Sequence, residues 1–429
     1  MEYKDVVTSF LLKDNKLLLL RRSAKVGTHK GKWAGVSGYL EEGEEALQRA
    51  QIEIKEELGL GPEQINLIRV GETLRGLDEQ TVWVVHPFLF EARTSEIRLD
   101  WENVEYRWID PNELFSFETV PKLKETFDRV QCNLQAAPPT LLKIFASVER
   151  FAQDRVQGAS ALGQLALDLV SSAGNASQAT DRDELFCDLL LVASRLRSAQ
   201  QAMANVGNMI SMLLFQVDLK RRSARSVADF KNLIGLVAKE ISERSKNAAE
   251  DAARNSLAIM PESGHVFTHS YSSAVLRAME LSKKAGRPLQ VYATESYPGM
   301  EGKKLAKALV NFGVPTKLVA DSAIGSIMSD VDLVLVGADS VLEDGSLLHK
   351  IGTKSIAAEA NERGIPVYSV CGSLKFSTAD LLGERPHYSE ALFDITPKEH
   401  VSKFITESGL VHPREVEGHI RLMLKEMYP

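Results

Sequence analysis

The sequence is poor in cysteine and has neither a long apolar run nor a long basic run. Its three cysteines, Cys132, Cys187 and Cys371, lie far apart and are odd in number, which argues against a disulfide framework and against a zinc site. No run approaches the roughly 18 apolar residues that span a bilayer, and no secretory leader pattern opens the chain. We therefore expect a reducing, cytoplasmic setting and no membrane partner.

The charge is mildly acidic, with 51 lysines and arginines against 58 aspartates and glutamates. Proteins that coat nucleic acid are typically basic, so we expect no direct nucleic-acid binding. The hydrophobic share of 44% is ordinary for a globular protein. At roughly 150 residues per domain, the 429 residues predict two or three domains.

The front of the chain has the pattern of a compact α/β domain. Short apolar runs interrupted by turn residues predict strands, and a longer amphipathic stretch predicts a helix. Gly59 follows that stretch and is a normal glycine at a helix C-terminus. The expected elements are a hairpin at 5–12 and 16–20, a helix at 44–58, strands at 81–90 and 104–109, and a closing helix at 121–130.

The rest of the chain changes pattern twice. Residues 140–254 read as helical, with a loop at 171–180. From residue 264, short β-like runs alternate with helical stretches, which predicts a parallel sheet with flanking helices. These runs are at 266–267, 289–293, 316–319, 333–336 and 367–370. The expected division is a first domain at 1–131, a linker at 132–139, a helical subdomain at 140–255 and a Rossmann-like domain at 256–429.

Three glutamates mark the first candidate site. Glu53, Glu56 and Glu57 are spaced i, i+3 and i+4, so one face of the 44–58 helix carries all three. Such a triplet is often only a solvated helix face. Here Gly38 and Gly43 form a loop directly before the helix, which favours a site for Mg²⁺ (or Mn²⁺) and a pyrophosphate.

The spacing from Gly38 to Leu60 resembles the Nudix box, with Gly38, Glu44, Glu53, Glu57 and Gly59 in register. The resemblance covers about residues 1–131. It implies an α/β/α sandwich and a metal-dependent pyrophosphohydrolase in which Glu53, Glu56 and Glu57 hold metal and a glutamate acts as general base. The family's arginine is replaced by Ile52. Arg49, four residues before Glu53, is a candidate substitute.

The choice of substrate is weakly encoded. Arg21, Arg22 and Lys32 are candidates for phosphate contacts, although ordinary solvated charge is an equal alternative. Trp33 is a candidate for stacking on a base, and a packing role is the alternative for it.

A second set of polar residues follows the β-like runs near the end of the chain. Ser270 and Ser272 lie between a run and a helix, where free backbone N–H groups bind phosphate. Asp339, Lys350 and Lys375 follow later runs. Because ligands bind beyond the carboxyl ends of parallel strands, we expect these side chains on one rim. The alternative is a set of helix caps with surface lysines.

These residues resemble the alpha, beta and delta regulatory subunits of translation initiation factor 2B and the related ribose-1,5-bisphosphate and methylthioribose-1-phosphate isomerases. The resemblance covers about residues 140–429 and implies dimers or larger homo-oligomers. Asp339 stands at the isomerases' aspartate, but Ser270 stands at their cysteine. Arg195 is a candidate for a phosphate-contacting arginine. The isomerases also carry an arginine in a phosphate-contact loop, and the residues at 156–159, which stand at that loop, lack it.

Three hypotheses follow for function. The main one is a Mg-dependent hydrolase of a nucleoside diphosphate derivative, such as ADP-ribose or another nucleotide sugar, fused to a domain that binds a sugar phosphate or nucleotide. The second is a regulatory or assembly protein resembling initiation factor 2B, with a weak or vestigial Nudix domain. The third is an aldose–ketose isomerase of the ribose-1,5-bisphosphate type.

Overall fold

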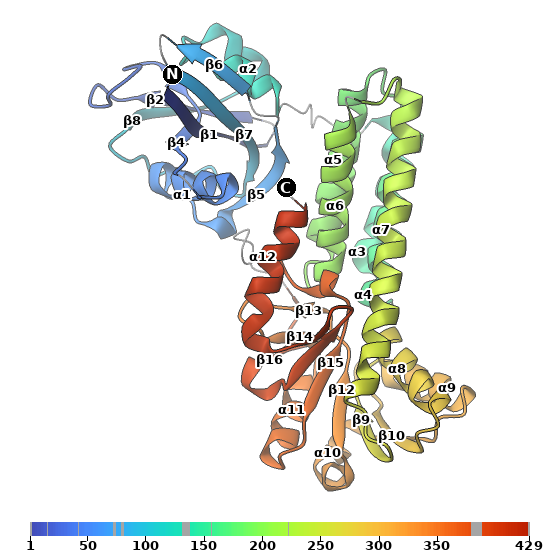
Figure 1. Cartoon of the computed structure of the whole chain (residues 1–429). Coiled ribbons are helices and arrows are strands. Elements are labelled where there is room, and N and C mark those ends of the chain that lie inside the picture. The colour runs from blue at the N-terminus through green and yellow to red at the C-terminus, as the bar shows by residue number, and fades with distance from the viewer. Residues whose placement is uncertain are drawn as a thin grey trace. The chain divides into compact units, whose positions relative to one another are not determined.

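The computed structural model describes residues 2–14, 16–41, 43–71, 74–78, 81–130, 138–155, 157–221, 223–378 and 388–427. They form two compact units, one built from residues up to 130 and one from residue 138 onward (Figure 1). The expected linker falls almost wholly outside the described residues. No helix in the described ranges is long and apolar enough to cross a membrane.

The N-terminal unit is built on one mixed sheet. Its central path runs β3-β2-β1-β7-β5, with β4 beside β1, β6 beside β7 and β8 beside β2. The expected hairpin, the helix before Gly59 and the two later strands are all present, with ends shifted by a few residues. The elements are β1 (Glu2–Lys13), β2 (Lys16–Arg22), β3 (Trp33–Ala34), β4 (Val36–Tyr39), α1 (Ala46–Leu58), β5 (Ile65–Val70), β6 (Leu74–Asp78), β7 (Thr81–Ala92), β8 (Asn103–Ile109) and α2 (Leu123–Asp128).

Both faces of this sheet are covered, because apolar side chains of β1 point alternately to its two faces. Val7 and Leu11 face one core, which Ala50, Ile54 and Leu58 of α1 complete. Phe10 and Leu12 face the other core, and the ring of Phe10 lies 5.0 Å from that of Phe127 on α2. A helix on each side of the sheet confirms the expected α/β/α sandwich.

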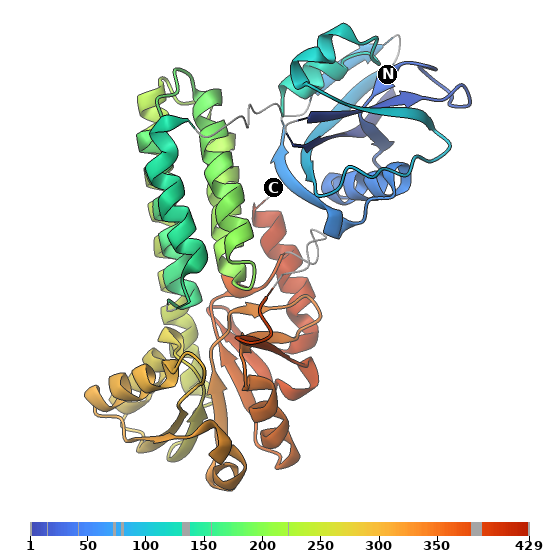
Figure 2. The same ribbon diagram turned by 180° about the vertical axis from the view of Figure 1, so that it is seen from behind.

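The second unit begins with five long helices that run side by side (Figures 1 and 2). Their length and apolar faces follow from the helical pattern expected for residues 140–254. They are α3 (Leu142–Gln153), α4 (Ala159–Ala176), α5 (Arg182–Ala199), α6 (Ala204–Arg221) and α7 (Val227–Asn255).

The loop expected at 171–180 is wrong over most of its length, because α4 continues to Ala176. Packing overrides the weak helix propensity of its Ser, Gly and Asn residues. A Cβ on Gly174 would lie 3.3 Å from Ile234 and 3.4 Å from Leu189, so this part of α4 is pressed between α7 and α5. The loop proper begins at Ser177, whose carbonyl oxygen accepts a 2.6 Å hydrogen bond from Lys231 Nζ.

The rest of the second unit is a seven-stranded sheet, β11-β10-β9-β12-β15-β17-β18, parallel except for its last pair. All five expected runs lie in its strands, which confirms the Rossmann-like arrangement. Its elements are β9 (Gly264–Thr268), α8 (Ser273–Lys284), β10 (Leu289–Thr294), α9 (Glu301–Asn311), β11 (Thr316–Val319), α10 (Ile324–Ile327), β12 (Leu333–Val336), α11 (Thr353–Glu362), β15 (Val367–Val370), β17 (Lys403–Thr406), β18 (Gly409–Val411) and α12 (Val416–Met427). A small antiparallel sheet of β13 (Ser340–Val341), β14 (Leu347–Lys350) and β16 (Phe393–Thr396) adjoins it.

The strand order reverses between β9 and β12. From β9 the chain winds through β10 to β11, whereas from β12 it winds the opposite way, through β15 to β17. In open α/β sheets such a switch point leaves a crevice at the carboxyl ends of the two central strands. The loops that follow β9 and β12 therefore meet there.

Candidate functional site

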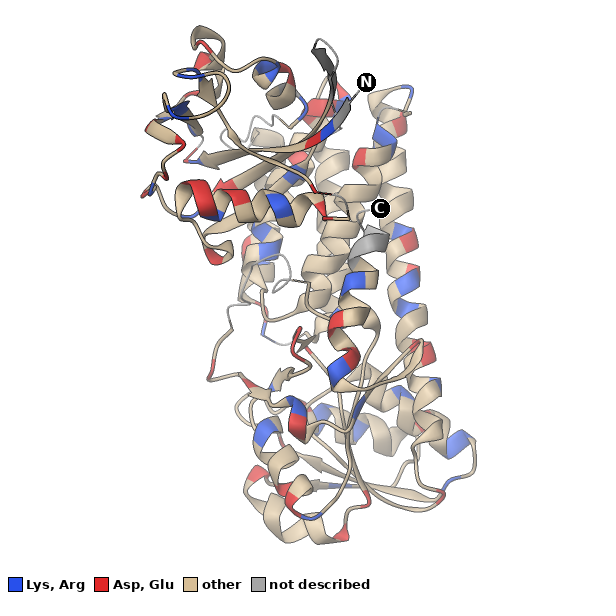
Figure 3. Ribbon diagram, turned by 60° about the vertical axis from the view of Figure 1, so that its left-hand side comes forward, with Lys and Arg blue, Asp and Glu red and all other residues tan. Residues whose placement is uncertain are grey.

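Helix α1 presents the three motif glutamates differently. Ala50, Ile54 and Leu58 anchor the helix in the core, and the glutamates occupy the flanking positions. Glu53 and Glu57 are buried, and Glu56 is exposed. Acidic and basic residues both colour this helix in Figure 3.

Glu57 is held by two neutral donors. Its carboxylate accepts a 3.0 Å hydrogen bond from the Ser37 backbone N–H and a 2.7 Å hydrogen bond from Asn103 Nδ2. Burial nevertheless raises the pKa of Glu57 to about 8, because these donors do not replace the lost water. Ser37 and Asn103 belong to no motif, and only the pairing of β4 and β8 into one sheet brings them to Glu57.

Glu53 has a cationic partner on its own helix. Arg49 Nη2 lies 2.5 Å from Glu53 Oε1, and Arg49 Nη1 lies 3.7 Å from Glu44 Oε1. Burial raises the pKa of Glu53, and Arg49 opposes this shift. Ile52, at the position of the motif arginine, is 40% exposed. Arg49, which lies one helical turn before Glu53, thus contacts both Glu53 and Glu44.

Gly38 allows the strand to pass directly beneath Glu53. A Cβ at this position would lie 1.8 Å from Glu53 Oε1, which no side chain tolerates without displacing the carboxylate. At the other end of α1, Gly59 has a φ of 68° and donates its N–H to the Lys55 carbonyl oxygen. The two motif glycines therefore set the approach of the strand and the end of the helix.

The oxygen-only donor set fits a hard divalent cation such as Mg²⁺. Within the described ranges, no three acidic, histidine or cysteine side chains converge into a ready-made metal cage. Mg²⁺ usually takes only one or two protein carboxylates, and phosphate oxygens and water complete its shell. The two hydrogen-bond donors of Glu57 are neutral, and burial raises its pKa, so a bound cation would stabilise the charged carboxylate.

The candidate substrate residues Arg21, Arg22 and Trp33 contact groups other than the three motif glutamates. Arg21 Nη1 lies 3.3 Å from Glu105, and Arg22 Nε donates to the Thr28 carbonyl oxygen. Trp33 is 8% exposed, and its ring lies 5.3 Å from that of Phe117 and 5.1 Å from the Arg107 guanidinium. These contacts are structural, and no observation joins the three residues to a substrate.

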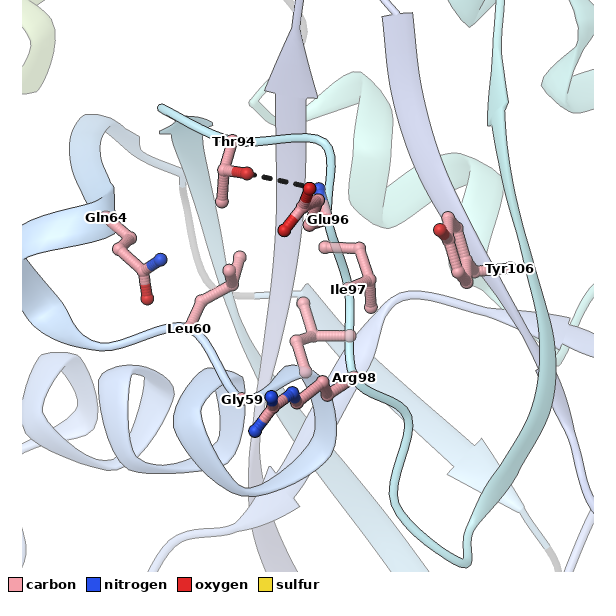
Figure 4. A pocket seen from close by; sticks show the side chains of 9 residues that line it. Gly59, Leu60, Gln64, Thr94, Glu96, Ile97, Arg98 and Tyr106 are labelled. Carbon is pink, nitrogen blue, oxygen red and sulfur yellow. Dashed lines mark hydrogen bonds between the residues drawn. The ribbon is translucent and has the colours of Figure 1, made fainter.

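A pocket opens at the C-terminal end of α1 (Figure 4). Its lining includes Gly59, Gln64, Arg98 and Tyr106, and its volume is about 490 Å³. None of the three motif glutamates lines it. The pocket is thus distinct from the carboxylate site.

In the second unit, Ser270 and Ser272 lie at the switch point after β9. Ser272 caps α8, and its Oγ accepts a 3.3 Å hydrogen bond from the Val275 N–H. A Cβ on Gly337, which follows β12, would lie 2.7 Å from that hydroxyl. Only a glycine at 337 permits the two loops to approach this closely.

Charged side chains converge on the same crevice. Burial raises the pKa of Asp339 to about 6, although the ammonium groups of Lys375 and Lys350 pull it down. Lys375 Nζ donates a 2.6 Å hydrogen bond to the carbonyl oxygen of Ala338. Lys350 Nζ lies 2.5 Å from Glu301 Oε1, with about a tenth of either side chain exposed.

The structure therefore brings Ser270, Ser272, Asp339, Lys350 and Lys375 to one rim, as the strand ends indicate. Glu301 is a member that the sequence reasoning missed. Its Oε2 is buried and has no hydrogen-bond partner among the described residues. Its signal in the sequence was its place beside Gly302-Lys303-Lys304, a segment that resembles the initiation factor 2B subunits and the related isomerases.

A hydrogen-bonded chain holds Ser270 in a left-handed conformation, with φ of 65°. The Ser270 N–H donates to Ser296 Oγ over 2.7 Å, and Ser296 Oγ lies 3.0 Å from Thr294 Oγ1. Thr294 Oγ1 is 2.6 Å from His269 Nδ1, and His269 Nε2 is 2.8 Å from the carbonyl oxygen of Ile351. A carbonyl only accepts, so Nε2 carries the hydrogen and Nδ1 accepts from Thr294.

Arg195 is not joined to this rim. It is exposed on α5, and its guanidinium carbon lies 4.1 Å from the centre of the Phe145 ring. In the part of the chain that the structure describes, no ion pair or hydrogen bond links it to the other five residues. A role in ligand contact stays a prediction.

Comparison with known proteins matches the two parts of the chain to two families. Residues 2–130 match the NUDIX domain, and residues 155–413 match the Initiation factor 2 subunit family, more than half of the chain. A putative translation initiation factor eIF-2B subunit 2-like protein of Pyrococcus furiosus is 33% identical over 198 residues, which are 44% of this chain and 72% of that protein. A ribose 1,5-bisphosphate isomerase of Haloferax volcanii is 25% identical over 64% of this chain and 88% of its own length.

Solved structures show the same fold in the second unit. The Pyrococcus horikoshii translation initiation factor eIF-2B superposes with a TM-score of 0.55 at 23% identity, over 63% of this chain and 98% of that one. A 5-methylthioribose 1-phosphate isomerase from the same organism superposes with a TM-score of 0.53 at 21% identity, over 66% and 88%. The chain belongs to the Initiation factor 2 subunit family and carries a NUDIX domain in front of the family domain.

Proposed function

We propose that the N-terminal unit is a Mg-dependent hydrolase of a nucleoside diphosphate derivative, such as ADP-ribose or another nucleotide sugar. The observation that carries this proposal is the local arrangement around α1. Two motif glutamates are buried and fixed by contacts from β4, β8 and Arg49, and the third is open to solvent. A merely solvated helix face needs no such fixation.

In this proposal Glu53, Glu56 and Glu57 hold Mg²⁺ (or Mn²⁺). The ion supplies Lewis acidity at the phosphate oxygens and a water of lowered pKa. Glu56 or Glu57 accepts the proton of the attacking water. Arg49 orients Glu53, and Asn103 with the Ser37 N–H orients Glu57.

The test is a Mg-dependent phosphate-release screen over nucleotide sugars, dinucleotides and nucleoside triphosphates. Glu56→Gln and Glu57→Gln abolish release if the proposal holds. Glu45→Gln is the matched control, because Glu45 is an exposed glutamate at the start of the same helix. Release that persists in both motif variants contradicts the role proposed for these glutamates. Silence of the wild-type protein across the panel contradicts hydrolysis and favours a regulatory protein with a vestigial Nudix domain.

For the second unit we propose binding of a phosphorylated sugar or nucleotide without isomerisation, in a homodimer or larger homo-oligomer. Lys350 and Lys375 provide positive charge at the switch point, and Ser272 with the α8 N-terminus provides hydrogen-bond donors. Ser270 stands where the isomerases carry a cysteine, and a hydroxyl is a far weaker acid than a thiol. Incubation with ribose 1,5-bisphosphate tests this proposal, since appearance of the ketose contradicts it.

A further inference from the structure

Helix α6 carries a buried asparagine near its N-terminal end. The helix packs against α4, α5 and α7, and buried residues cover most of its circumference. Asn208 lies among these residues and is 2% exposed. Burying an amide without hydrogen-bond partners is costly, so the partners of Asn208 show what this end of α6 holds in place.

The Asn208 amide holds the segment that carries Lys375. Its Nδ2 donates hydrogen bonds of 2.8 Å to the carbonyl oxygens of Leu374 and Phe376, the residues on either side of Lys375. Its Oδ1 accepts a 2.8 Å hydrogen bond from Thr378 Oγ1. Both N–H groups and the oxygen of the amide are therefore engaged by one segment, and α6 fixes the path of that segment.

The same end of α6 also holds the segment that carries Asp339. The N–H of Ala204, the first residue of the helix, donates a 2.9 Å hydrogen bond to Ser340 Oγ. The Ser340 hydroxyl donates its own hydrogen to the carbonyl oxygen of Ala202 over 2.8 Å. Ser340 is fully buried and follows Asp339 directly. A side chain from β13 thus caps α6, where a helix otherwise leaves its first N–H groups without partners.

A third hydrogen bond joins the two segments to each other. Lys375 Nζ donates to the carbonyl oxygen of Ala338, the residue before Asp339, over 2.6 Å. The segments that carry Asp339 and Lys375 are therefore each bonded to α6 and are bonded to one another. Because these contacts form a closed set, moving Lys375 relative to Asp339 breaks at least one of them.

We infer that α6 positions Asp339 and Lys375 at the second site through Ser340 and Asn208. Ser340 and Asn208 are buried and bonded within the protein, so they are positioning residues that act through the two charged side chains. The inference rests on the ligand binding proposed for the second unit and adds that the helical subdomain sets the affinity of that site. A coupling between two parts of a protein is reciprocal, so a ligand that fixes Lys375 also stabilises the N-terminal end of α6.

A merely structural role for Asn208 predicts a different result. A residue that only stabilises the fold lowers Tm when it is removed and leaves the ligand affinity of the folded protein unchanged. Asn361 on α11 is the matched control for this role. Its Nδ2 also donates to two carbonyl oxygens, those of Ala357 and His400, over 2.9 Å and 3.1 Å, and neither acceptor belongs to the rim.

The first measurement is the affinity of the full chain for ribose 5-phosphate and for AMP by isothermal titration calorimetry. The Lys375→Ala protein identifies the binding that belongs to the second unit. Asn208→Ala is expected to weaken that binding about tenfold, because Lys375 keeps its charge but loses its fixed position for a charge-assisted hydrogen bond. Ser340→Ala is expected to act in the same direction, and Asn361→Ala is expected to leave the affinity unchanged.

The second measurement needs no ligand. Acetic anhydride modifies lysine amines in the intact folded protein, and the rate at each lysine is read from peptide masses. Lys375 is expected to react several-fold faster in Asn208→Ala than in the wild-type protein, because its hydrogen bond to Ala338 is no longer enforced. Lys246, an exposed residue of α7, is the internal reference and is expected to react at the same rate in both proteins.

The two measurements separate this inference from the binding on which it rests. Unchanged affinity and unchanged Lys375 reactivity in folded Asn208→Ala and Ser340→Ala proteins overturn the inference and leave the binding proposal standing. A wild-type protein that binds neither ribose 5-phosphate nor AMP contradicts the binding proposal. In that case faster modification of Lys375 in the variants still supports the positioning, and an unchanged rate overturns it. If Asn208→Ala does not fold, Ser340→Ala decides both measurements.

Discussion

Replacing Arg49 by alanine tests whether this residue has taken over the task of the missing motif arginine. In the structure its guanidinium reaches Glu53 over 2.5 Å and Glu44 over 3.7 Å. The substitution leaves a buried carboxylate without its cation. Glu53 then loses both its orientation and part of its charge balance, and hydrolysis is expected to fall without loss of the fold.

The expected size of the effect follows from burial. About 26% of the Arg49 side chain and 10% of the Glu53 side chain are exposed. Exposed ion pairs contribute roughly 0.2–1 kcal/mol, whereas removing one partner of a buried pair costs roughly 3–5 kcal/mol. An intermediate value for the free energy of the pair is about 2 kcal/mol. If the transition state loses the same amount because Glu53 is no longer oriented, kcat/KM falls roughly 30-fold.

The assay is Mg-dependent hydrolysis of the best substrate from the screen, with purified wild-type, Arg49→Ala and Lys55→Ala proteins. Lys55 is an exposed cation on the same helix and controls for the loss of one positive charge. The double variant Arg49→Ala/Ile52→Arg is expected to regain part of the lost rate, since it restores the motif. An Arg49→Ala protein as active as Lys55→Ala would refute the assignment.

Three further predictions concern the close approach at Gly38 and two buried carboxylates. Gly38→Ala moves Glu53 and lowers kcat at least tenfold by a phosphate-release assay, whereas Gly27→Ala, where a Cβ meets nothing within 4 Å, leaves it unchanged. The folded-state pKa of Asp339 is raised from 3.8 to about 6, so the folded state binds more protons in this window and stability falls as pH rises through it. Because Asp339 keeps some solvent contact, the free energy of unfolding of the wild-type protein is expected to fall by about 1–2 kcal/mol between pH 4 and pH 6. This fall disappears in Asp339→Asn, as measured by urea unfolding at each pH. The same pH dependence in both proteins contradicts the prediction. Glu301→Ala leaves Lys350 buried without its ion-pair partner and lowers Tm by several degrees in thermal unfolding. Glu295→Ala breaks the more exposed pair with Lys303 and changes Tm by less than about 2 °C. Equal shifts of Tm in the two variants contradict the role of burial.

Part of the carboxylate site can be predicted from the spacing of residues along the chain alone. Spacings of three and four residues place Glu53, Glu56 and Glu57 on one side of a helix whatever surrounds it. The same reasoning pairs Arg49 with Glu53 one turn away, and the structure confirms this contact. Which glutamates are buried is not local, because it depends on the strands that α1 packs against.

In the second unit, the sequence predicts the position of the rim but not all of its residues. The alternation of short β runs and helices indicates a parallel sheet, and the ends of its strands indicate the rim where Ser270 and Asp339 lie. Glu301 was missed because its carboxylate reaches Lys350 from a different strand–helix connection. The expected loop at 171–180 was wrong because packing on α5 and α7 extends α4.

By itself the sequence determined the order of the two folds, the identity of the motif glutamates and the loss of the motif arginine and of the isomerase cysteine. These are properties of residue type and short spacing, which the chain carries before it folds. The tertiary structure alone decided that Asn103 holds Glu57, that Trp33 is buried, and that Glu301 meets Lys350. Those contacts join residues tens of positions apart, so they exist only once strand register and sheet order are set.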